Sequence, residues 1–267
     1  MSPSQSETLQ WTIELARAAG ARLLDWFGNV KADLKSDGTL VTQADTEVDQ
    51  FLSESVRATY PRDEIISEEL HSNYTGDASA TATWVFDPLD GTTNFANGLP
   101  IWGISIARLK GGHPQLGVLY FPMIDEMLYV ERGKGAFLNG ERFHAPNADK
   151  MEWNDVFACD ALVLKRYDVG HHGKTRLLGA AAFDLVSVAT GRARALLLAR
   201  PKLWDVAAGW LLIEEAGAVI EPLDDKRPFP LQSHKDYATE NFPLVAAVSP
   251  AIHATIRANI RLVPQKR

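Results

Sequence analysis

The 267-residue sequence contains a single cysteine, Cys159. One thiol cannot form a disulfide within the chain, which excludes the disulfide-stapled class of small secreted domains and indicates a reducing compartment. A lone cysteine is ordinarily a small, buried, apolar residue. We therefore expect Cys159 to pack in the core and to take no part in catalysis.

Long hydrophobic runs and an excess of positive charge are also missing. The apolar runs are much shorter than the ~20 residues that span a membrane, and the polar N-terminus lacks the apolar core of a signal peptide. The formal net charge is -7, which disfavours binding to nucleic acid or to anionic membranes. These absences predict a soluble, cytoplasmic protein whose partner is neither a nucleic acid polymer nor a membrane.

The sequence does contain enough apolar material for a large core, with 46% hydrophobic residues. Apolar residues recur at helical spacing over residues 6–27 and 44–59, with Ser6 as a candidate N-cap. From about residue 63 to residue 143, apolar runs alternate with turn residues at hairpin spacing. This pattern predicts two helices followed by an antiparallel sheet.

A polar stretch, HAPNADKMEWND, follows this sheet and marks the predicted boundary between residues 1–144 and residues 145–267. Strands and helices alternate beyond it, beginning with a strand in DVFACDALVL. Helices are predicted at about residues 181–190, 206–216 and 250–259. The alternation favours a layered α/β second part.

The segment WVFDPLDGTTNF ends an apolar run on two acids, Asp87 and Asp90. Because Pro88 fixes φ and removes an N–H donor, we expect the strand to end there. Gly91 permits a tight turn and close backbone approach. A short helix beginning at Thr92 would offer N–H groups to a phosphate oxygen, and two carboxylates beside such a site suit Mg²⁺.

A simpler interpretation of this segment stays open, namely a turn with two solvated aspartates. If the two carboxylates lie ~4 Å apart at an effective dielectric of ~20, they repel by about 4 kcal/mol, which a cation or a proton would remove. Two other loops are excluded. The spacing is one residue too long for the Asp-x-Asp-Gly-Thr loop of haloacid dehalogenases, and the acids that an EF-hand requires do not follow Gly91.

Two further segments carry acids at the ends of apolar stretches. IISEEL places Glu68 and Glu69 after a strand, where a solvated sheet edge explains them equally well. LWDVAAGW places Asp205 where a helix would begin, and an ordinary N-cap explains that position.

Together, three motifs in this order resemble the inositol monophosphatase family of Mg²⁺-dependent, lithium-sensitive phosphatases. The motifs are SEE at 67–69, DPLDGTTNF at 87–95, and WDVAAG at 204–209 with EAG at 215–217. The segments at 35–45, 133–142 and 177–193 also resemble the family, so the resemblance runs nearly end to end. It implies an α+β/α/β layered αβαβα sandwich, usually a homodimer, with N-terminal helices on an antiparallel sheet and a mixed α/β C-terminal part.

The resemblance further implies a set of metal ligands. Glu68, Asp87 and the Leu89 carbonyl would hold one Mg²⁺, and Asp87, Asp90 and Asp205 would hold a second. Glu68 with waters would hold a third, weaker ion.

Catalytic roles follow from the same resemblance. The N–H groups of Gly91 and Thr92 would bind the phosphate. Thr92, paired with Asp45, would orient the attacking water and help to deprotonate it, with Glu68 beside them. Lys35 lies near this segment, and a surface lysine is its simpler interpretation.

Substrate recognition is where the sequence departs from the family. The family's substrate-contacting helix start is matched by Gly179, Ala180 and Ala181. Leu198, however, stands where related enzymes usually carry a glutamate that binds ring hydroxyls, and Arg200 and Lys202 follow it. These two cations could face a second anionic group of a bisphosphorylated sugar or nucleotide, or could be solvated loop charges.

The resulting hypothesis is a Mg²⁺-dependent phosphomonoesterase that hydrolyses a small phosphorylated sugar or polyol other than simple inositol monophosphate. Fructose-1,6-bisphosphatase, 3′-phosphoadenosine 5′-phosphate phosphatase and histidinol-phosphatase are alternatives of the same class. A non-catalytic scaffold that retains the fold is an alternative of a different class. His171 and His172 are expected to be loop residues rather than metal ligands.

Overall fold

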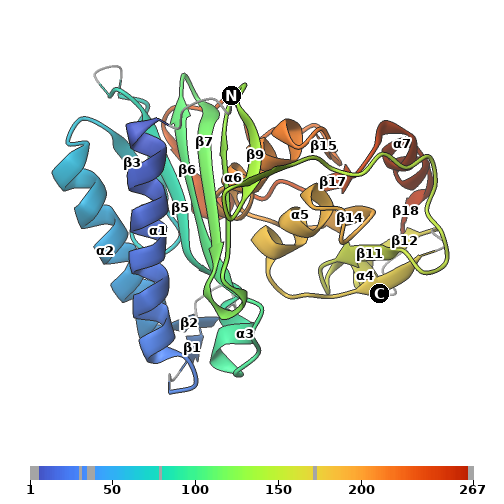
Figure 1. Ribbon diagram of the computed structural model, residues 1–267, viewed down its shortest axis with the longest axis horizontal. Helices are drawn as coiled ribbons and strands as arrows, with labels where there is room; N and C mark the ends of the chain where they lie inside the picture. Colours follow the sequence, from blue (N-terminus) through green and yellow to red (C-terminus); the bar gives the residue numbers. More distant parts are fainter. Residues whose placement is uncertain (1–5, 30–31, 35–39, 78–79, 171–172, 264–267) are drawn as a thin grey trace.

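The computed structural model describes residues 6–29, 32–34, 40–77, 80–170 and 173–263. Its elements form the expected αβαβα sandwich, in which two sheets alternate with three layers of helices (Figure 1). Lys35, His171 and His172 lie outside the described residues.

The outer helices of the first sheet lie close to where the sequence predicts them. Helix α1 spans Glu7–Trp26 and α2 spans Gln43–Thr59. The Ser6 hydroxyl oxygen accepts a hydrogen bond from the Leu9 N–H at 3.1 Å, so Ser6 is the N-cap of α1. Both helices bury one apolar stripe against the same face of the first sheet (Figure 1).

The first sheet has seven strands in the order β10-β9-β8-β7-β6-β5-β3. The strands are β3 (Glu64–Ser67), β5 (Thr83–Asp90), β6 (Gly103–Lys110), β7 (His113–Phe121), β8 (Glu126–Glu131), β9 (Gly135–Leu138) and β10 (Glu141–Phe143). All neighbours are antiparallel except β3 and β5, which are parallel. The antiparallel prediction is therefore confirmed for all pairs but this one.

The expectation that β5 ends at Pro88 is wrong, because the strand continues to Asp90. Pairing with β6 passes from Asp87 opposite Ser105 to Asp90 opposite Gly103, which leaves one extra residue on β5. A bulge of this kind tolerates proline, since a bulged residue need not donate to the ladder. The bulge places both aspartates at the end of one strand.

The second sheet has five strands in the order β13-β11-β14-β17-β15. They are β11 (Val156–Cys159), β13 (Lys174–Arg176), β14 (Ala195–Leu198), β15 (Val219–Pro222) and β17 (Leu244–Ala247). DVFACDALVL is not one strand. It breaks after Cys159 because the Asp160 carboxylate accepts hydrogen bonds from the N–H groups of Leu162 and Val163, just before the short helix α4 (Val163–Arg166).

Two helices, α5 (Ala181–Ala189) and α6 (Leu203–Glu215), fill the layer between the sheets, and α7 (Pro250–Asn259) covers the far side of the second sheet (Figure 1). Every residue of α6 from Val206 to Ile213 is buried, as expected for a helix enclosed on all sides. One hydrophobic core joins both sheets through this layer. The division at residues 144 and 145 stays a prediction.

The remaining elements are short. They are α3 (Thr92–Ala96), the 3₁₀ helices η1 (Pro122–Ile124) and η2 (Tyr237–Thr239), and three pairs of strands. The pairs are β1 (Ala32–Leu34) with β2 (Leu40–Thr42), β4 (Asn73–Tyr74) with β16 (Lys235–Asp236), and β12 (Tyr167–Val169) with β18 (Ile260–Leu262). Among the described helices, none is both long and apolar enough to cross a membrane.

Candidate active site

Three distant parts of the chain meet at one end of the first sheet. Strands β3 and β5 are parallel neighbours, so Glu68, which follows β3, lies beside the end of β5 with Asp87 and Asp90. Helix α6 packs on the inner face of the sheet and brings Asp205 to the same place. These four acids line one cavity of about 180 Å³, together with Leu89, Gly91 and Thr92.

The aspartates are held by backbone N–H groups. Asp90 accepts hydrogen bonds from the N–H groups of Ala181 and Ala182, both at 2.9 Å, at the start of α5. The sequence suggested that Asp205 is the N-cap of α6, but Asp205 is the third residue of this helix. Its Oδ2 accepts from the N–H of Lys202, the actual N-cap residue, at 2.7 Å. These bonds fix the carboxylates without neutralising them.

The electrostatics of the cavity disfavour several negative charges. Burial, followed by the charges of Glu68, Asp90 and Asp205, raises the pKa of Asp87 well above its usual range. Burial, followed by the charges of Asp90 and Glu68, also raises the pKa of Asp205 well above its usual range. Burial raises the pKa of Asp90 to about 7 despite the opposing backbone hydrogen bonds. Bound cations would reverse these shifts.

The donor set of the cavity suits a hard cation, because it consists of carboxylate and carbonyl oxygens. Within the described ranges, no three acidic, histidine or cysteine side chains already stand in a ligating arrangement. The carboxylates instead accept from nearby N–H groups, such as Leu89 N–H to Asp87 Oδ1 at 2.9 Å. A carboxylate oxygen has two lone pairs, so these bonds leave acceptor capacity for a metal ion.

Thr92 and Asp45 form a hydrogen-bonded pair at the edge of the cavity. The Thr92 hydroxyl lies 2.9 Å from Asp45 Oδ1 and 3.1 Å from the Leu89 carbonyl oxygen. It has one proton, so it donates to one of them at a time. Asp45 is fully buried in the first turn of α2, where its Oδ2 also accepts from the Thr42 N–H at 2.8 Å. Burial raises the pKa of Asp45, against the hydrogen bonds from Thr42 and Thr92.

Two glycines shape the backbone of the site. Gly91 has φ of 92° and directly precedes α3, and a Cβ there would lie 2.9 Å from the Ile101 carbonyl oxygen. Gly179 has φ of 79°, and its Cβ would lie 3.0 Å from the Asn94 side chain. Both positions therefore require glycine. The Asn94 Nδ2 donates to the carbonyls of Ile101 and Leu178, both at 2.7 Å, and so ties α3 to the chain before α5.

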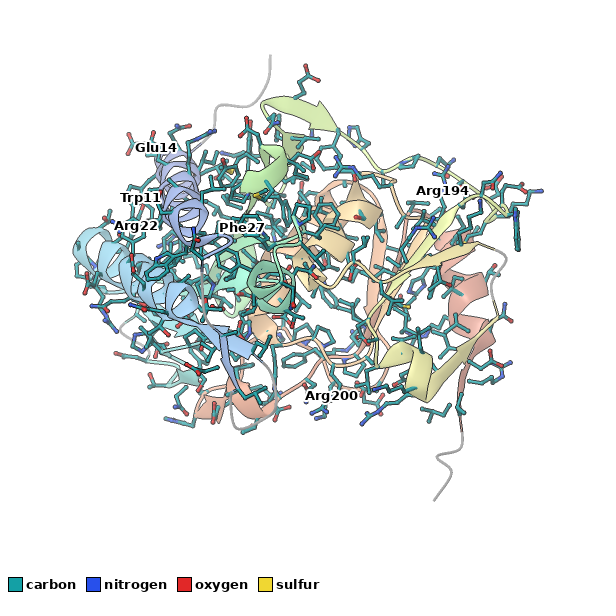
Figure 2. The ribbon with its side chains drawn as sticks, turned by 90° about the horizontal axis from the view of Figure 1, so that it is seen from below. Trp11, Glu14, Arg22, Phe27, Arg194 and Arg200 are labelled. Atoms are coloured by element: carbon teal, nitrogen blue, oxygen red, sulfur yellow. The ribbon has the colours of Figure 1, made fainter. Side chains whose placement is uncertain are left out.

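A groove of about 440 Å³ continues from the cavity, with Gly179 and Asp205 common to both. Ala180, Ala181, Leu198 and Arg200 line this groove, and Figure 2 shows Arg200 at the periphery of the molecule. Lys202 lines neither space, and its Nζ donates to the Ala238 carbonyl. Arg200 is therefore better placed than Lys202 to meet a substrate.

Cys159 also lines the groove and is buried, as the sequence predicts. Burial, followed by the charges of Asp160 and Asp184, raises the pKa of its thiol to about 12. A thiol that resists ionisation is a poor nucleophile. This agrees with the expected absence of a catalytic role.

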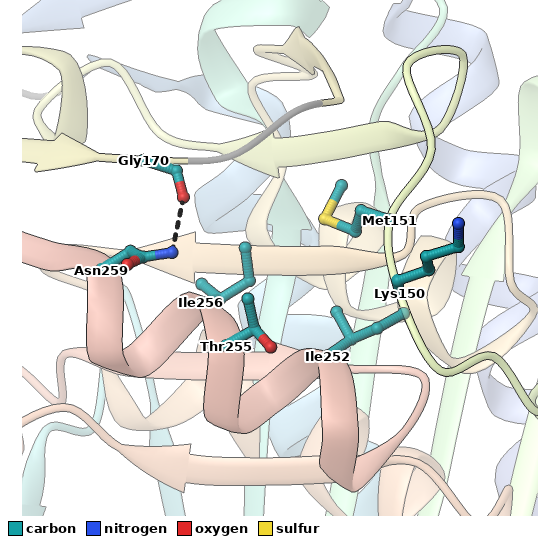
Figure 3. A pocket seen from close by; sticks show the side chains of 7 residues that line it. All are labelled: Lys150, Met151, Gly170, Ile252, Thr255, Ile256 and Asn259. Carbon is teal, nitrogen blue, oxygen red and sulfur yellow. Dashed lines mark hydrogen bonds between the residues drawn. The ribbon is translucent and has the colours of Figure 1, made fainter.

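A separate cavity lies against α7 and is shown in Figure 3. It has a volume of about 110 Å³ and is lined by Lys150, Met151, Gly170, Ile252, Thr255, Ile256 and Asn259. The Asn259 side chain donates to the Gly170 carbonyl at 3.0 Å. Because this lining has no carboxylate, the cavity offers nothing that the predicted chemistry needs.

Asp49 is a residue that the sequence analysis missed. It is fully buried on α2, one turn beyond Asp45, and accepts hydrogen bonds from the Ser67 hydroxyl at 2.9 Å and the Glu69 N–H at 3.0 Å. It therefore holds the residues on both sides of Glu68, Ser67 through its side chain and Glu69 through its backbone. The spacing of four residues between two acids on one predicted helix face was the available signal.

Comparison with known proteins agrees with this arrangement. A profile of the inositol monophosphatase family matches residues 4–261. The inositol-1-monophosphatase of Mesorhizobium japonicum is 34% identical over 238 residues, covering 83% of this chain and 87% of that protein. Nus factor SuhB of Escherichia coli K12 is 31% identical over 269 residues, covering 95% of each. The solved IMPase structure from Thermotoga maritima matches with a TM-score of 0.79 at 28% identity, covering 95% of this chain and 96% of that one.

Proposed function

Because the chain belongs to the inositol monophosphatase family, whose members are phosphoric monoester hydrolases, we propose that it releases phosphate from a small phosphorylated sugar or polyol by Mg²⁺-dependent attack of water. The supporting observation is a single cavity where four acids lie beside the Thr92–Asp45 pair. Water as the attacking group removes the need for a serine or cysteine nucleophile.

The proposed metal ligands are those implied by the resemblance. Glu68, Asp87 and the Leu89 carbonyl would hold one Mg²⁺, Asp87, Asp90 and Asp205 a second, and Glu68 with waters a third. When bound, such ions neutralise phosphate charge and lower the pKa of a nearby water. Inhibition by Li⁺ belongs to the same proposal.

The chain's own residues would orient the reactants. The N–H groups of Gly91 and Thr92 would hold the phosphate oxygens, since the left-handed Gly91 leaves the backbone uncovered there. The Thr92 hydroxyl would accept a hydrogen bond from the attacking water while it donates to Asp45. Asp45, with its raised pKa, is suited to receive a proton through Thr92, and Glu68, which lines the same cavity, would assist.

The substrate contacts, the oligomeric state, the cellular location and the absence of nucleic-acid binding belong to the same proposal. Gly179, Ala180 and Ala181 would contact the substrate, with Arg200, and less directly Lys202, available to an anionic group. We expect a cytoplasmic homodimer, on the family resemblance and the lone buried thiol. Binding to nucleic acid is not expected at a net charge of -7. An RNA-binding assay checks this, since one relative carries the name Nus factor.

A phosphate-release assay with p-nitrophenyl phosphate and fructose 1,6-bisphosphate tests the function. We expect release with Mg²⁺, none with EDTA, and inhibition by Li⁺. Asp90→Asn should abolish the Mg²⁺-dependent release while circular dichroism stays that of the folded protein. Asp168→Asn, on the exposed middle residue of β12, is the matched control and should retain activity. Release that is independent of Mg²⁺ or of Asp90 would reject the assignment, and a folded protein without any phosphatase activity would favour the scaffold.

A further inference from the structure

Glu68 lies in a bend between β3 and β4, so no helix or strand of its own fixes its direction. The Ser67 N–H donates to the His71 carbonyl at 2.7 Å, which closes residues 67–71 into a compact turn. The other three acids of the cavity, in contrast, belong to β5 and α6. The position of Glu68 therefore depends on the contacts that hold this turn.

Asp49 on α2 supplies such contacts. Its Oδ1 accepts from the Ser67 hydroxyl at 2.9 Å, and its Oδ2 accepts from the Glu69 N–H at 3.0 Å. The Ser53 hydroxyl, one turn further along α2, donates to the same Oδ1 at 3.2 Å. Asp49 is 0% exposed and lines neither the cavity nor the groove. It therefore supports the neighbours of Glu68 and is not itself placed to bind a ligand.

Helix α2 also holds another part of the site. Asp45, one turn before Asp49, lies 2.9 Å from the Thr92 hydroxyl through its Oδ1. Residues four apart lie on the same face of a helix, so two buried carboxylates on one face of α2 connect Thr92 and the Glu68 turn to one regular element. A functional group supported from a helix is placed more precisely than one on an unsupported loop.

We propose that Asp49 is a positioning residue, which sets the affinity of the cavity for Mg²⁺ by holding Glu68 in place. The inference rests on the proposed function, because it takes Glu68 as a metal ligand. Hydrogen-bond partners that orient metal ligands typically contribute about 10- to 100-fold to metal affinity. Asp49 acts here through the residues on both sides of Glu68, and it contacts neither the substrate nor the attacking water.

Binding of Mg²⁺ to the whole chain tests this proposal without any substrate. The dissociation constant is measured by calorimetric titration and by the rise in melting temperature above its value in EDTA. Asp49→Ala removes all three hydrogen bonds, and we expect the dissociation constant to rise by about 10- to 100-fold. In phosphate release, the Mg²⁺ concentration that gives half of the maximal rate should rise by the same factor, while kcat at saturating Mg²⁺ stays close to that of the wild type.

Two further variants separate positioning from charge and from stability. In Asp49→Asn, the amide oxygen can still accept from the Glu69 N–H, and the amide nitrogen can donate to the hydroxyl oxygens of Ser67 and Ser53. Its Mg²⁺ affinity should therefore stay close to that of the wild type. Val56→Ala, at a buried apolar position of the same helix, should lower the melting temperature but keep the dissociation constant.

Each outcome decides the assignment. An Asp49→Ala protein that binds Mg²⁺ as tightly as the wild type overturns the role of Asp49 and leaves the phosphatase function intact. An equal loss of affinity in Asp49→Asn or in Val56→Ala also overturns it, since charge or stability would then be the cause. If Asp49→Ala does not fold, Ser67→Ala decides, because its dissociation constant should rise and an unchanged value contradicts the proposal. A wild-type protein that neither binds Mg²⁺ nor hydrolyses p-nitrophenyl phosphate refutes the proposed function instead.

Discussion

The acidic cavity makes the stability of the metal-free protein depend on pH in an unusual direction. Buried Asp90 has its pKa raised from 3.8 to about 7. A carboxyl group with a raised pKa in the folded state stabilises that state fully below the unfolded pKa, and this contribution is lost as the pH rises through the folded pKa. The loss therefore falls between about pH 4 and pH 7. The raised pKa values of Asp87 and Asp205 act in the same direction.

The size of the effect follows from the same pKa difference. At about 1.4 kcal/mol for each pKa unit, the change at Asp90 corresponds to at most about 4 kcal/mol. For a chain of this length, that is on the order of 10 °C in melting temperature. Half-buried His71 and buried His253 oppose it, since their lowered pKa values favour the folded state at higher pH. The wild-type curve alone therefore does not isolate Asp90.

Comparison with Asp90→Asn isolates the contribution. The amide keeps an acceptor for one of the N–H groups of Ala181 and Ala182 but opposes the other, a cost of about 1–3 kcal/mol that does not vary with pH. In EDTA, the wild-type protein should therefore lose up to about 4 kcal/mol relative to the variant between pH 4 and pH 8. Thermal or urea unfolding followed by circular dichroism measures this difference.

Addition of Mg²⁺ at pH 8 should restore the stability of the wild-type protein. Saturation at one hundred times the dissociation constant gives about 2.7 kcal/mol for one site, and the variant should gain less. Asp168→Asn controls for the amide substitution as such. A wild-type-minus-variant difference that is flat with pH, or that grows in favour of the wild type as pH rises, would refute the buried-charge reasoning.

Three further changes have definite expected results. Thr92→Val removes the hydroxyl that contacts Asp45, so kcat should fall by about 10² or more, whereas Thr92→Ser should retain most of it; steady-state kinetics decide. Gly91→Ala should lower phosphate release without unfolding the protein, because the Cβ would meet the Ile101 carbonyl at 2.9 Å; unchanged kinetics would contradict this. Glu215→Ala should cost about 1–3 kcal/mol of stability but leave kcat/KM unaltered, since this carboxylate accepts two backbone N–H groups of the β8–β9 turn outside the cavity.

Local sequence patterns predicted the helices and the helix cap that depend on residues close together in the chain. The apolar periods of α1 and α2 and the capping role of Ser6 follow from residues close together in the chain. The end of β5 at Pro88 was predicted wrongly, because a bulge depends on the partner strand β6, which the local pattern does not include. The start of α6 was predicted three residues too late for a related reason, since helix ends are set by capping contacts and the N-cap is Lys202 instead of Asp205.

The sequence by itself determined which chemistry this protein could carry, because the types and spacing of acids, glycines and threonines are local properties of the motifs. Only the tertiary structure decided that Glu68 lies beside β5 and that the buried Asp45 and Asp49 support the site. These relations depend on the parallel pairing of β3 with β5 and on α5 and α6 packing between two sheets. Such long-range contacts arise when the whole core is buried together, and no short segment encodes them.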